Sequence, residues 1–352
     1  MSESLSDLTL ALRELADGED RDPQWPARGI AAAAERGAMR WCISPAYGGI
    51  GVDSAALLER YEALGRGSLS IALILTQRDG ACQLLEAGEN EELKNRLLPS
   101  FAAGDAMVTV GISQLTTSTG SGSMPHMSAR AACDGYTLHG RMPWVTAAGQ
   151  CDQIVTGAVL EDGRQLLASV PVTAEGLCVG PPLALLALES SMTARVECDG
   201  VLVTEAMLLR PVQHEVLRQR APTKSLTVAA VGIGFAASLL DEIRTLQPPG
   251  DGEFDGMISL LDETYSGLRT RVMDCAAKLD DATFEVPKSE IRAAVNDLIN
   301  RAAVVCMTLA KGTGYLSSHR AQKLLREAMF FNVWSAPTDV RKLTLTRLLA
   351  HP

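Results

Sequence analysis

Apolar positions along the chain change their period twice, which divides the sequence into three parts. In the first part leucines and aromatics recur at three- and four-residue spacing, as at Leu57, Tyr61 and Leu64, and Pro99 and Gly104 interrupt the pattern at its end. Side chains at this spacing lie on one face of an α-helix. Residues 1–105 are therefore predicted to form a helical N-terminal domain.

The second part alternates between short β-branched runs and turn residues. Six runs of strand length carry this pattern: Val108 to Ile112, Tyr136 to Leu138, Ile154 to Leu160, Leu166 to Val170, Ala194 to Cys198 and Val201 to Val203. Short strands at such regular spacing are typical of a small barrel or sandwich. Residues 106–211 are therefore predicted to form a middle β domain.

Long helical patterns return in the third part. They cover Leu226 to Ile243, Met257 to Leu279, Pro287 to Leu309 and Leu316 to Asn332. Four helices of that length with short connections form a bundle. Residues 212–352 are predicted to be a C-terminal four-helix domain, which makes the fold class α+β.

Composition and charge exclude some kinds of partner. With 352 residues, 47% of them apolar, the chain can fill a sizeable core. The net charge of −10 and the absence of Lys/Arg runs argue against a nucleic-acid or membrane-surface partner. The segment that begins at Met1 has no basic start and no apolar run, so we expect a cytoplasmic protein.

Neither cysteine nor histidine spacing indicates a catalytic or metal site. The eight cysteines are scattered singly, with no C-x-x-C pair and no histidine at ligand spacing. We expect the cysteines to behave as small buried hydrophobic residues of a protein in a reducing compartment, and we expect no metal site. The five histidines have no nucleophile motif beside them, so surface or capping roles are expected.

Near its end the chain carries a run of motifs that resembles the acyl-CoA dehydrogenase family. Gly312-Thr313-Gly314-Tyr315, then Lys323 to Ala328, then Val333 to Leu343 are similar to the family pattern G-x-G-Y, K-L-x-R-D-A, I-Y-E-G-T-x-x-I-x-R-L, without a gap. Upstream, Pro45 to Gly51 resembles the family's P-x-x-Y-G-G-x-G turn. The resemblance covers nearly the whole chain and implies the same three-domain architecture.

The resemblance also implies an FAD site. Tyr136 to Thr146 is similar to the family's Y-x-L-N-G-x-K-x-W-I-T, which would place Trp144, Val145 and Thr146 against the flavin ring. The alternative for Trp144 is an ordinary buried aromatic on a strand. The resemblance further implies Ser113 and Ser118 at the pyrimidine edge and pyrophosphate. Three tail residues, Gly312, Gly314 and Thr338, would contact the nucleotide.

The catalytic glutamate of the family is missing. Its E-G-T reads Ser335-Ala336-Pro337 here, and a lone serine hydroxyl is not a strong base near neutral pH. Lys224 occupies the family's second slot for the base, with Ser225 where a substrate-binding arginine often follows. Loss of a general base typically costs about 10²- to 10⁴-fold in rate. We therefore assign Ser335 to the vacated base position and Lys224 and Ser225 to substrate contacts, without identifying a base.

Three functions fit these residues. The first is an acyl-CoA dehydrogenase-like flavoprotein oxidoreductase acting on an acyl thioester of coenzyme A or of a carrier protein. The second is a flavin-poor or flavin-free acyl-binding relative, which could be a subunit beside an intact paralogue; Lys311 in the G-G-x-G turn and the lack of an arginine before Phe254 favour it. The third is a flavin monooxygenase, which needs no α-proton base. The resemblance also implies a homodimer or homotetramer.

Overall fold

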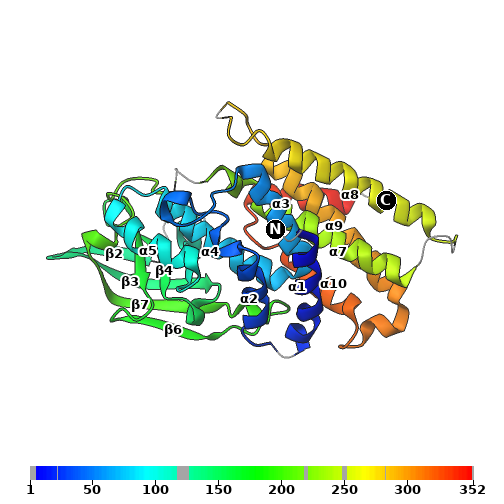
Figure 1. Ribbon diagram of the computed structural model, residues 1–352, viewed down its shortest axis with the longest axis horizontal. Helices are drawn as coiled ribbons and strands as arrows, with labels where there is room; N and C mark the ends of the chain where they lie inside the picture. The colour runs from blue at the N-terminus through cyan, green and yellow to red at the C-terminus, as the bar shows by residue number, and fades with distance from the viewer. Residues whose placement is uncertain are drawn as a thin grey trace.

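The computed structural model describes residues 5–21, 23–116, 127–217, 221–247, 252–281 and 283–350. In Figure 1 a curled sheet lies at one end, a group of long helices at the other, and the N-terminal helices lie between them. The order of N-terminal helices, sheet and C-terminal helices confirms the predicted fold class. The domain boundaries at 105/106 and 211/212 stay predictions.

The N-terminal part is helical, as predicted. Its helices are α1 (Leu5–Arg21), α2 (Ala27–Glu35), α3 (Ser54–Gly67), α4 (Leu69–Glu86) and α5 (Glu91–Ala103), with short 3-10 turns η1 (Ala38–Arg40) and η2 (Pro45–Tyr47). Polar caps explain where two of them begin: Asp53 accepts from the backbone N–H of Ala56, and Asn90 from that of Leu93. Gly104, at a φ of 81°, ends α5. Sequence alone therefore sets these helix ends.

The middle part is one seven-stranded sheet. Its strands are β1 (Val108–Gly111), β2 (Met127–Ala132), β3 (Gly135–Val145), β4 (Gln153–Val159), β5 (Gln165–Pro171), β6 (Leu177–Pro182) and β7 (Ala194–Val203), and short turns α6 (Ser113–Thr116), η3 (Ala148–Gln150), η4 (Glu189–Ser191) and η5 (Glu205–Met207) lie between or after them. The order is β1-β4-β2-β3-β7-β6, with β5 on β4. Helix α4 packs on β1 and β4 and covers the sheet on the side of the N-terminal helices (Figure 1).

The strand predictions were incomplete, and the run Tyr136 to Leu138 covers only the start of β3. Strands β2 and β6 were missed, because β2 is half exposed and β6 ends in two prolines. The runs Ala194 to Cys198 and Val201 to Val203 are one strand rather than two. Asp199-Gly200 forms a β-bulge instead of a turn, since the register against β3 shifts there and Gly200 has a φ of 73°.

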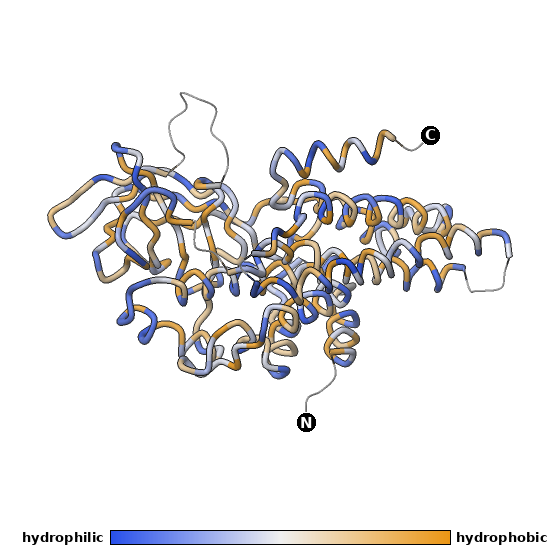
Figure 2. Tube along the Cα trace, turned by 90° about the horizontal axis from the view of Figure 1, so that it is seen from above, coloured by the Kyte–Doolittle hydropathy of each residue, from blue (hydrophilic) through white to orange (hydrophobic). Residues whose placement is uncertain are grey.

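The C-terminal part has one helix more than predicted. It contains η6 (Pro222–Ser225), α7 (Thr227–Leu246), α8 (Asp255–Ala276), α9 (Lys288–Ala310), η7 (Lys311–Tyr315), α10 (Arg320–Phe330) and α11 (Thr338–Ala350). Helix α10 begins at Arg320 instead of Leu316. Helix α11 was missed because only Val340 and Thr344 are buried, which leaves no apolar period to detect. Figure 2 shows this last helix beside the bundle, with hydrophilic and hydrophobic residues intermixed.

Among the described residues, one helical segment, Lys288–Tyr315, is long and apolar enough to cross a membrane. The rest of the chain buries 67% of its most apolar window. A core helix of a soluble protein has the same length and composition, so this segment is weak evidence for a membrane span.

Two glycines bring the N-terminal and C-terminal helices into backbone contact. A Cβ at Gly234 on α7 would collide with the carbonyl oxygen of Glu62 on α3, and a Cβ at Gly65 on α3 would collide with the carbonyl oxygen of Val231 on α7. Neither neighbour is a flexible side chain that could move aside. The crossing of α3 and α7 is therefore fixed by the absence of side chains at these positions.

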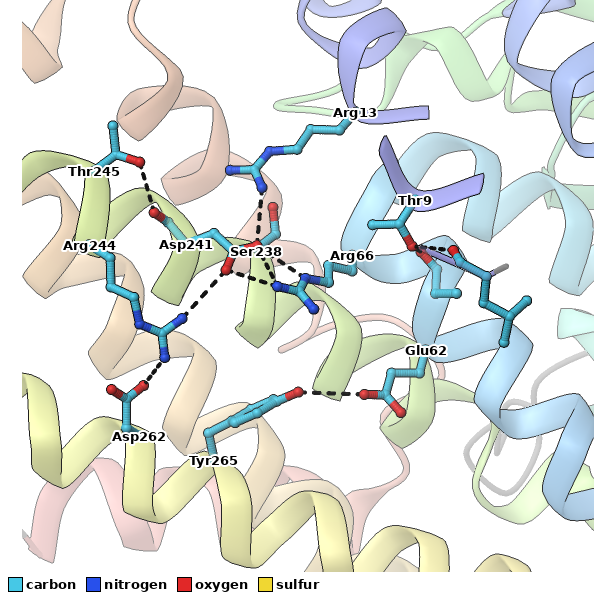
Figure 3. A network of polar contacts seen from close by, with 12 residues as sticks. Thr9, Arg13, Glu62, Arg66, Ser238, Asp241, Arg244, Thr245, Asp262 and Tyr265 are labelled. Atoms are coloured by element: carbon cyan, nitrogen blue, oxygen red, sulfur yellow. Dashed lines mark hydrogen bonds and ion pairs between the residues drawn. The ribbon is translucent and has the colours of Figure 1, made fainter. Parts of the chain in front are cut away.

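Charges next to this crossing join the same helices (Figure 3). The carboxylate of Asp241 on α7 accepts hydrogen bonds from three arginines. Arg13 on α1 donates at 3.0 Å, Arg66 on α3 donates through two nitrogens at 2.9 and 3.0 Å, and Arg244 donates at 3.4 Å. The neighbouring Glu242 lies 3.4 Å from Arg320 on α10. The adjacent residues Asp241 and Glu242 thus form ion pairs between helices.

Substituting Gly234 tests this crossing. We expect Gly234→Ala to lower the free energy of unfolding by about 3 kcal/mol or more, because the new methyl group overlaps backbone atoms that cannot move alone. The matched control is Gly267→Ala on α8, where a Cβ meets no atom within 4 Å. That change should stabilise the protein by about 0.5–1 kcal/mol through helix propensity. Urea unfolding of both variants measures the difference, and equal stabilities would contradict a close crossing.

Candidate functional site

Three hydroxyl side chains meet where β3 ends and β7 begins. Val145 on β3 pairs with Ala194 on β7, so Thr146 and Thr193, the next residues out, lie opposite each other. The two hydroxyl oxygens are 3.4 Å apart, and that of Thr193 is 2.8 Å from the hydroxyl of Ser191. All three side chains are buried. The backbone N–H of Ala147 donates to the carbonyl of Ser191 at 2.9 Å and holds the two segments together.

The direction of these hydrogen bonds leaves one donor unused. In the geometry of the longer contact the Thr193 hydroxyl donates to Thr146. A hydroxyl carries one proton, so Ser191 must be the donor to Thr193. Thr146 then accepts a proton and retains its own, and within the described part of the chain no acceptor is recorded for it. A buried donor without an acceptor is costly unless a bound group supplies one.

The backbone around this chain of hydroxyls is unusual. Ala147, Leu188 and Met192, which are not glycines, have φ values of 56°, 66° and 47°. Such left-handed conformations cost about 1–3 kcal/mol each and concentrate at functional sites. Ala147 directly follows Thr146, and Met192 lies between Ser191 and Thr193. The strain therefore lies next to the hydroxyl groups.

Of the predicted ring contacts, Trp144 and Thr146 lie at this end of the sheet together, and Val145 differs from both. Trp144 is 58% exposed, which rules out the alternative of a buried strand aromatic. Its indole is uncovered by protein and can accept a planar ligand. The side chain of Val145 is fully buried in the core of the sheet, so only its main chain could touch a ligand.

Ser113 lies on a short turn beside the sheet, and Ser118 lies outside the described residues. Ser113 begins α6, a single turn that follows β1 and packs against β3 and β4. Gln114 anchors this turn: its side-chain amide donates to the carbonyls of Gly111 and Gly157 and to the hydroxyl of Thr156, at 2.8–3.1 Å. Sequence reasoning missed Gln114, which places Ser113.

Ser335, which is predicted to mark the vacated base position, follows a firmly held turn. Its side chain is exposed, and its own φ is 44°. The buried guanidinium of Arg292 on α9 donates to the carbonyls of Phe331 at 2.8 Å and Trp334 at 3.0 Å. Phe330 stacks on Trp334 at 5.2 Å between ring centroids. Burial lowers the pKa of Arg292 to about 9. The turn before Ser335 is thus fixed, although sequence reasoning did not identify Arg292.

The tail residues that are predicted to contact the nucleotide differ in their surroundings. Gly314 is buried, and a Cβ there would come within 2.6 Å of the Cβ of Ala310, so its glycine is required. Gly312 has open space around it. Lys311, which replaces a family glycine, has φ 54° and ψ −150°, a conformation that glycine adopts most easily. Thr338 is exposed at the start of α11, and its hydroxyl accepts from Arg341 at 3.1 Å.

The predicted substrate contacts lie on η6, at the start of the C-terminal part. Lys224 is half-buried, and the hydroxyl of Ser225 donates to the carbonyl of Pro222 at 2.9 Å. In the tail motif, Arg326 pairs with Asp20 on α1 at 2.6 Å, not with Glu327. Burial raises the pKa of Glu327, which lines a cavity of about 10 Å³, roughly one water molecule, with Lys323 and Asp20.

The remaining cysteine and histidine predictions are partly confirmed. Cys133 and Cys178 are exposed, so the expectation of buried cysteines was wrong for these two: Cys133 lies in the turn between β2 and β3, and Cys178 lies near the start of the edge strand β6. His319 accepts from the backbone N–H of Ala321 and caps α10, which confirms a capping role. His139 lies 3.5 Å from Asp199 at the bulge. His126 and His351 lie outside the described residues.

Comparisons with known proteins agree with this architecture. The family model described as acyl-CoA dehydrogenase, N-terminal domain, matches residues 10–105. Probable acyl-CoA dehydrogenase YngJ of Bacillus subtilis is 22% identical over 359 residues, covering 95% of this chain and 92% of that protein. These matches support membership of the acyl-CoA dehydrogenase superfamily.

Solved structures show how widely this superfamily fold is used. Glutaryl-coenzyme A dehydrogenase, solved as its glutaryl-CoA complex, matches with a TM-score of 0.84 at 20% identity, covering 99% of this chain and 96% of that one. Dibenzothiophene monooxygenase from Paenibacillus matches with a TM-score of 0.83 at 14% identity, with the same coverages. At these identities the likeness shows the fold, and the chemistry must be argued from the site.

Proposed function

We propose that this chain is an acyl-CoA dehydrogenase-like flavoprotein oxidoreductase. The observation that carries the proposal is the buried Thr146 hydroxyl, which keeps a proton to donate and has no recorded acceptor among the described residues. Its neighbour Trp144 offers an uncovered aromatic face. A planar ring system with acceptor atoms along one edge fits both groups. A flavin, when bound, would supply an acceptor for two electrons.

The residues that would hold FAD follow from this placement. Trp144 would cover one face of the ring, Thr146 would donate to its edge, and the main chain at Val145 would run beside it. We assign Ser113 and Ser118 to the pyrimidine edge and the pyrophosphate. The tail residues Gly312, Gly314 and Thr338 are assigned to the nucleotide, with Lys311 in the backbone conformation that glycine favours.

We propose an acyl thioester, of coenzyme A or of a carrier protein, as the substrate. Support comes from superfamily membership and from the glutaryl-CoA complex of a protein with the same fold. Lys224 and Ser225 on η6 would contact the thioester. For α,β-dehydrogenation the chain would need a base for the α-proton, and a bound flavin would supply the acceptor for the hydride of the β-carbon. The chain must supply that base from a residue other than Ser335.

One observation favours a second candidate function, oxygen-dependent monooxygenation. Ser335 carries no carboxylate, and such a reaction does not require removal of an α-proton. Dibenzothiophene monooxygenase has the same fold. The two functions differ in what an acyl thioester does to the flavin in the absence of oxygen, since only a dehydrogenase substrate transfers its electrons there.

Visible absorption tests flavin binding directly. The protein is purified without added cofactor, and its spectrum is recorded before and after incubation with excess FAD or FMN and desalting. We expect stoichiometric flavin peaks, because the Thr146 donor and the Trp144 face are preformed. A colourless protein that retains neither flavin would contradict the proposal and favour a non-redox acyl-binding role.

Restoring the carboxylate tests the position of Ser335. In the flavin-loaded protein we expect Ser335→Glu to accelerate anaerobic bleaching by a panel of straight-chain acyl-CoA thioesters by about 10²- to 10⁴-fold. The matched control is Ser335→Gln. Glutamine has the shape of glutamate without its basicity, and it meets the same backbone strain at residue 335. Equal rates for the two variants would show that residue 335 does not face the reacting carbon.

We also propose a homodimer or homotetramer that buries the outer face of α11. Leu345, Leu348 and Leu349 are exposed there. Light scattering of the wild type should give two or four times 37.4 kDa, and Leu345→Glu with Leu349→Glu should reduce that mass. Leu10→Glu, on the exposed face of α1, is the control. A wild-type mass of 37.4 kDa would exclude self-association.

A further inference from the structure

We propose that Ser191 and Thr193 are positioning residues that fix the direction of the Thr146 hydroxyl, so that it presents a proton and not a lone pair to the bound flavin. This inference rests on the proposed flavin function and goes beyond it, because it assigns a role to two residues of the Ser190 to Thr193 segment.

The first argument is directional. A free threonine hydroxyl rotates about its C–O bond and can either donate or accept. At Thr146 the lone pairs already receive the proton of Thr193, which limits the directions left for its own O–H. Because Thr193 already donates its proton to Thr146, the hydroxyl of Ser191 can only donate to Thr193. The three hydroxyls therefore form a one-way chain that ends at Thr146.

The second argument is the burial of the chain. Ser191 has no exposed surface, and Thr193 and Thr146 have 6% and 8% of theirs. Water therefore does not compete for these hydroxyls along most of the chain. Successive hydrogen bonds in such surroundings polarise one another, so a donor at the end of the chain is stronger than an isolated hydroxyl.

The third argument is the backbone conformation. Met192 is held at φ 47° and ψ 37° between the two donors, and Ala147 is held at φ 56° immediately after the acceptor. With an extended backbone at Met192 the Ser191 and Thr193 side chains would also lie on one side of the segment, but about 6.5 Å apart along it. The left-handed turn shortens this separation, and the two hydroxyl oxygens are 2.8 Å apart. The strain thus maintains the hydroxyl chain.

A double-mutant cycle on flavin affinity tests the proposal. Thr193→Val keeps the shape and removes the hydroxyl, and we expect it to weaken FAD binding about two- to tenfold and to shift the visible spectrum of the bound flavin. Thr193→Ser, the conservative variant, should restore both. In a Thr146→Val background, Thr193→Val should have no further effect, because the chain then has no end group. Affinity is measured by quenching of FAD fluorescence.

The outcomes separate this proposal from the function on which it rests. If wild-type protein binds no flavin, both are overturned. If it binds flavin, but the Thr146 and Thr193 substitutions act additively or Thr193→Val leaves affinity and spectrum unchanged, only the positioning role is overturned. Should Thr193→Val fail to fold, Ser191→Ala replaces it in the cycle, since it removes the first donor and is expected to give a smaller loss in the same direction.

Discussion

The close crossing of α3 and α7 is the constraint on which the rest of the molecule depends. Because Gly65 and Gly234 let the two backbones touch, the N-terminal helices and the C-terminal helices share one continuous apolar core. The ion pairs of Asp241 join α7 to α1 and α3 next to this crossing, and they add directional hydrogen bonds to the apolar contact. Helix α4 extends from these helices onto the sheet. The position of the sheet relative to the C-terminal helices is therefore set by the packing of helices against one another.

This frame leaves the ends of β3 and β7 free to carry strained turns. Regular strand pairing stops at Val145 and Ala194, and the next residues on both sides turn with left-handed backbone at Ala147 and Met192. Such turns are stable only where their surroundings hold them. The fully packed core of the sheet supplies that support. The hydroxyl chain from Ser191 to Thr146 is then a direct consequence of where the strands end.

The C-terminal tail contains a firmly held turn just before Ser335. Arg292 and the aromatic residues around Trp334 hold the turn that precedes Ser335, the residue that we assign to the position of the family's glutamate. Under this proposal the turn is kept, and the hydroxyl of Ser335 stands in place of a carboxylate. This separation agrees with a superfamily in which one fold supports several flavin chemistries.

Local patterns in the sequence determined most of the elements, and the physical reason is that periodicity and caps act over a few residues. The long helices, the runs of β3 to β5 and the glycine turns could be predicted, and the motifs around Trp144 and Ser335 indicated the superfamily. Helix α11, the half-exposed β2 and the bulge at Gly200 gave no clear periodic signal. The contact of Thr193 with Thr146, the support of Ser335 by Arg292 and the crossing at Gly234 join residues 42 to 172 positions apart along the chain. Only the tertiary structure could decide these contacts, since they depend on how separate elements pack and on which buried hydrogen bonds remain open.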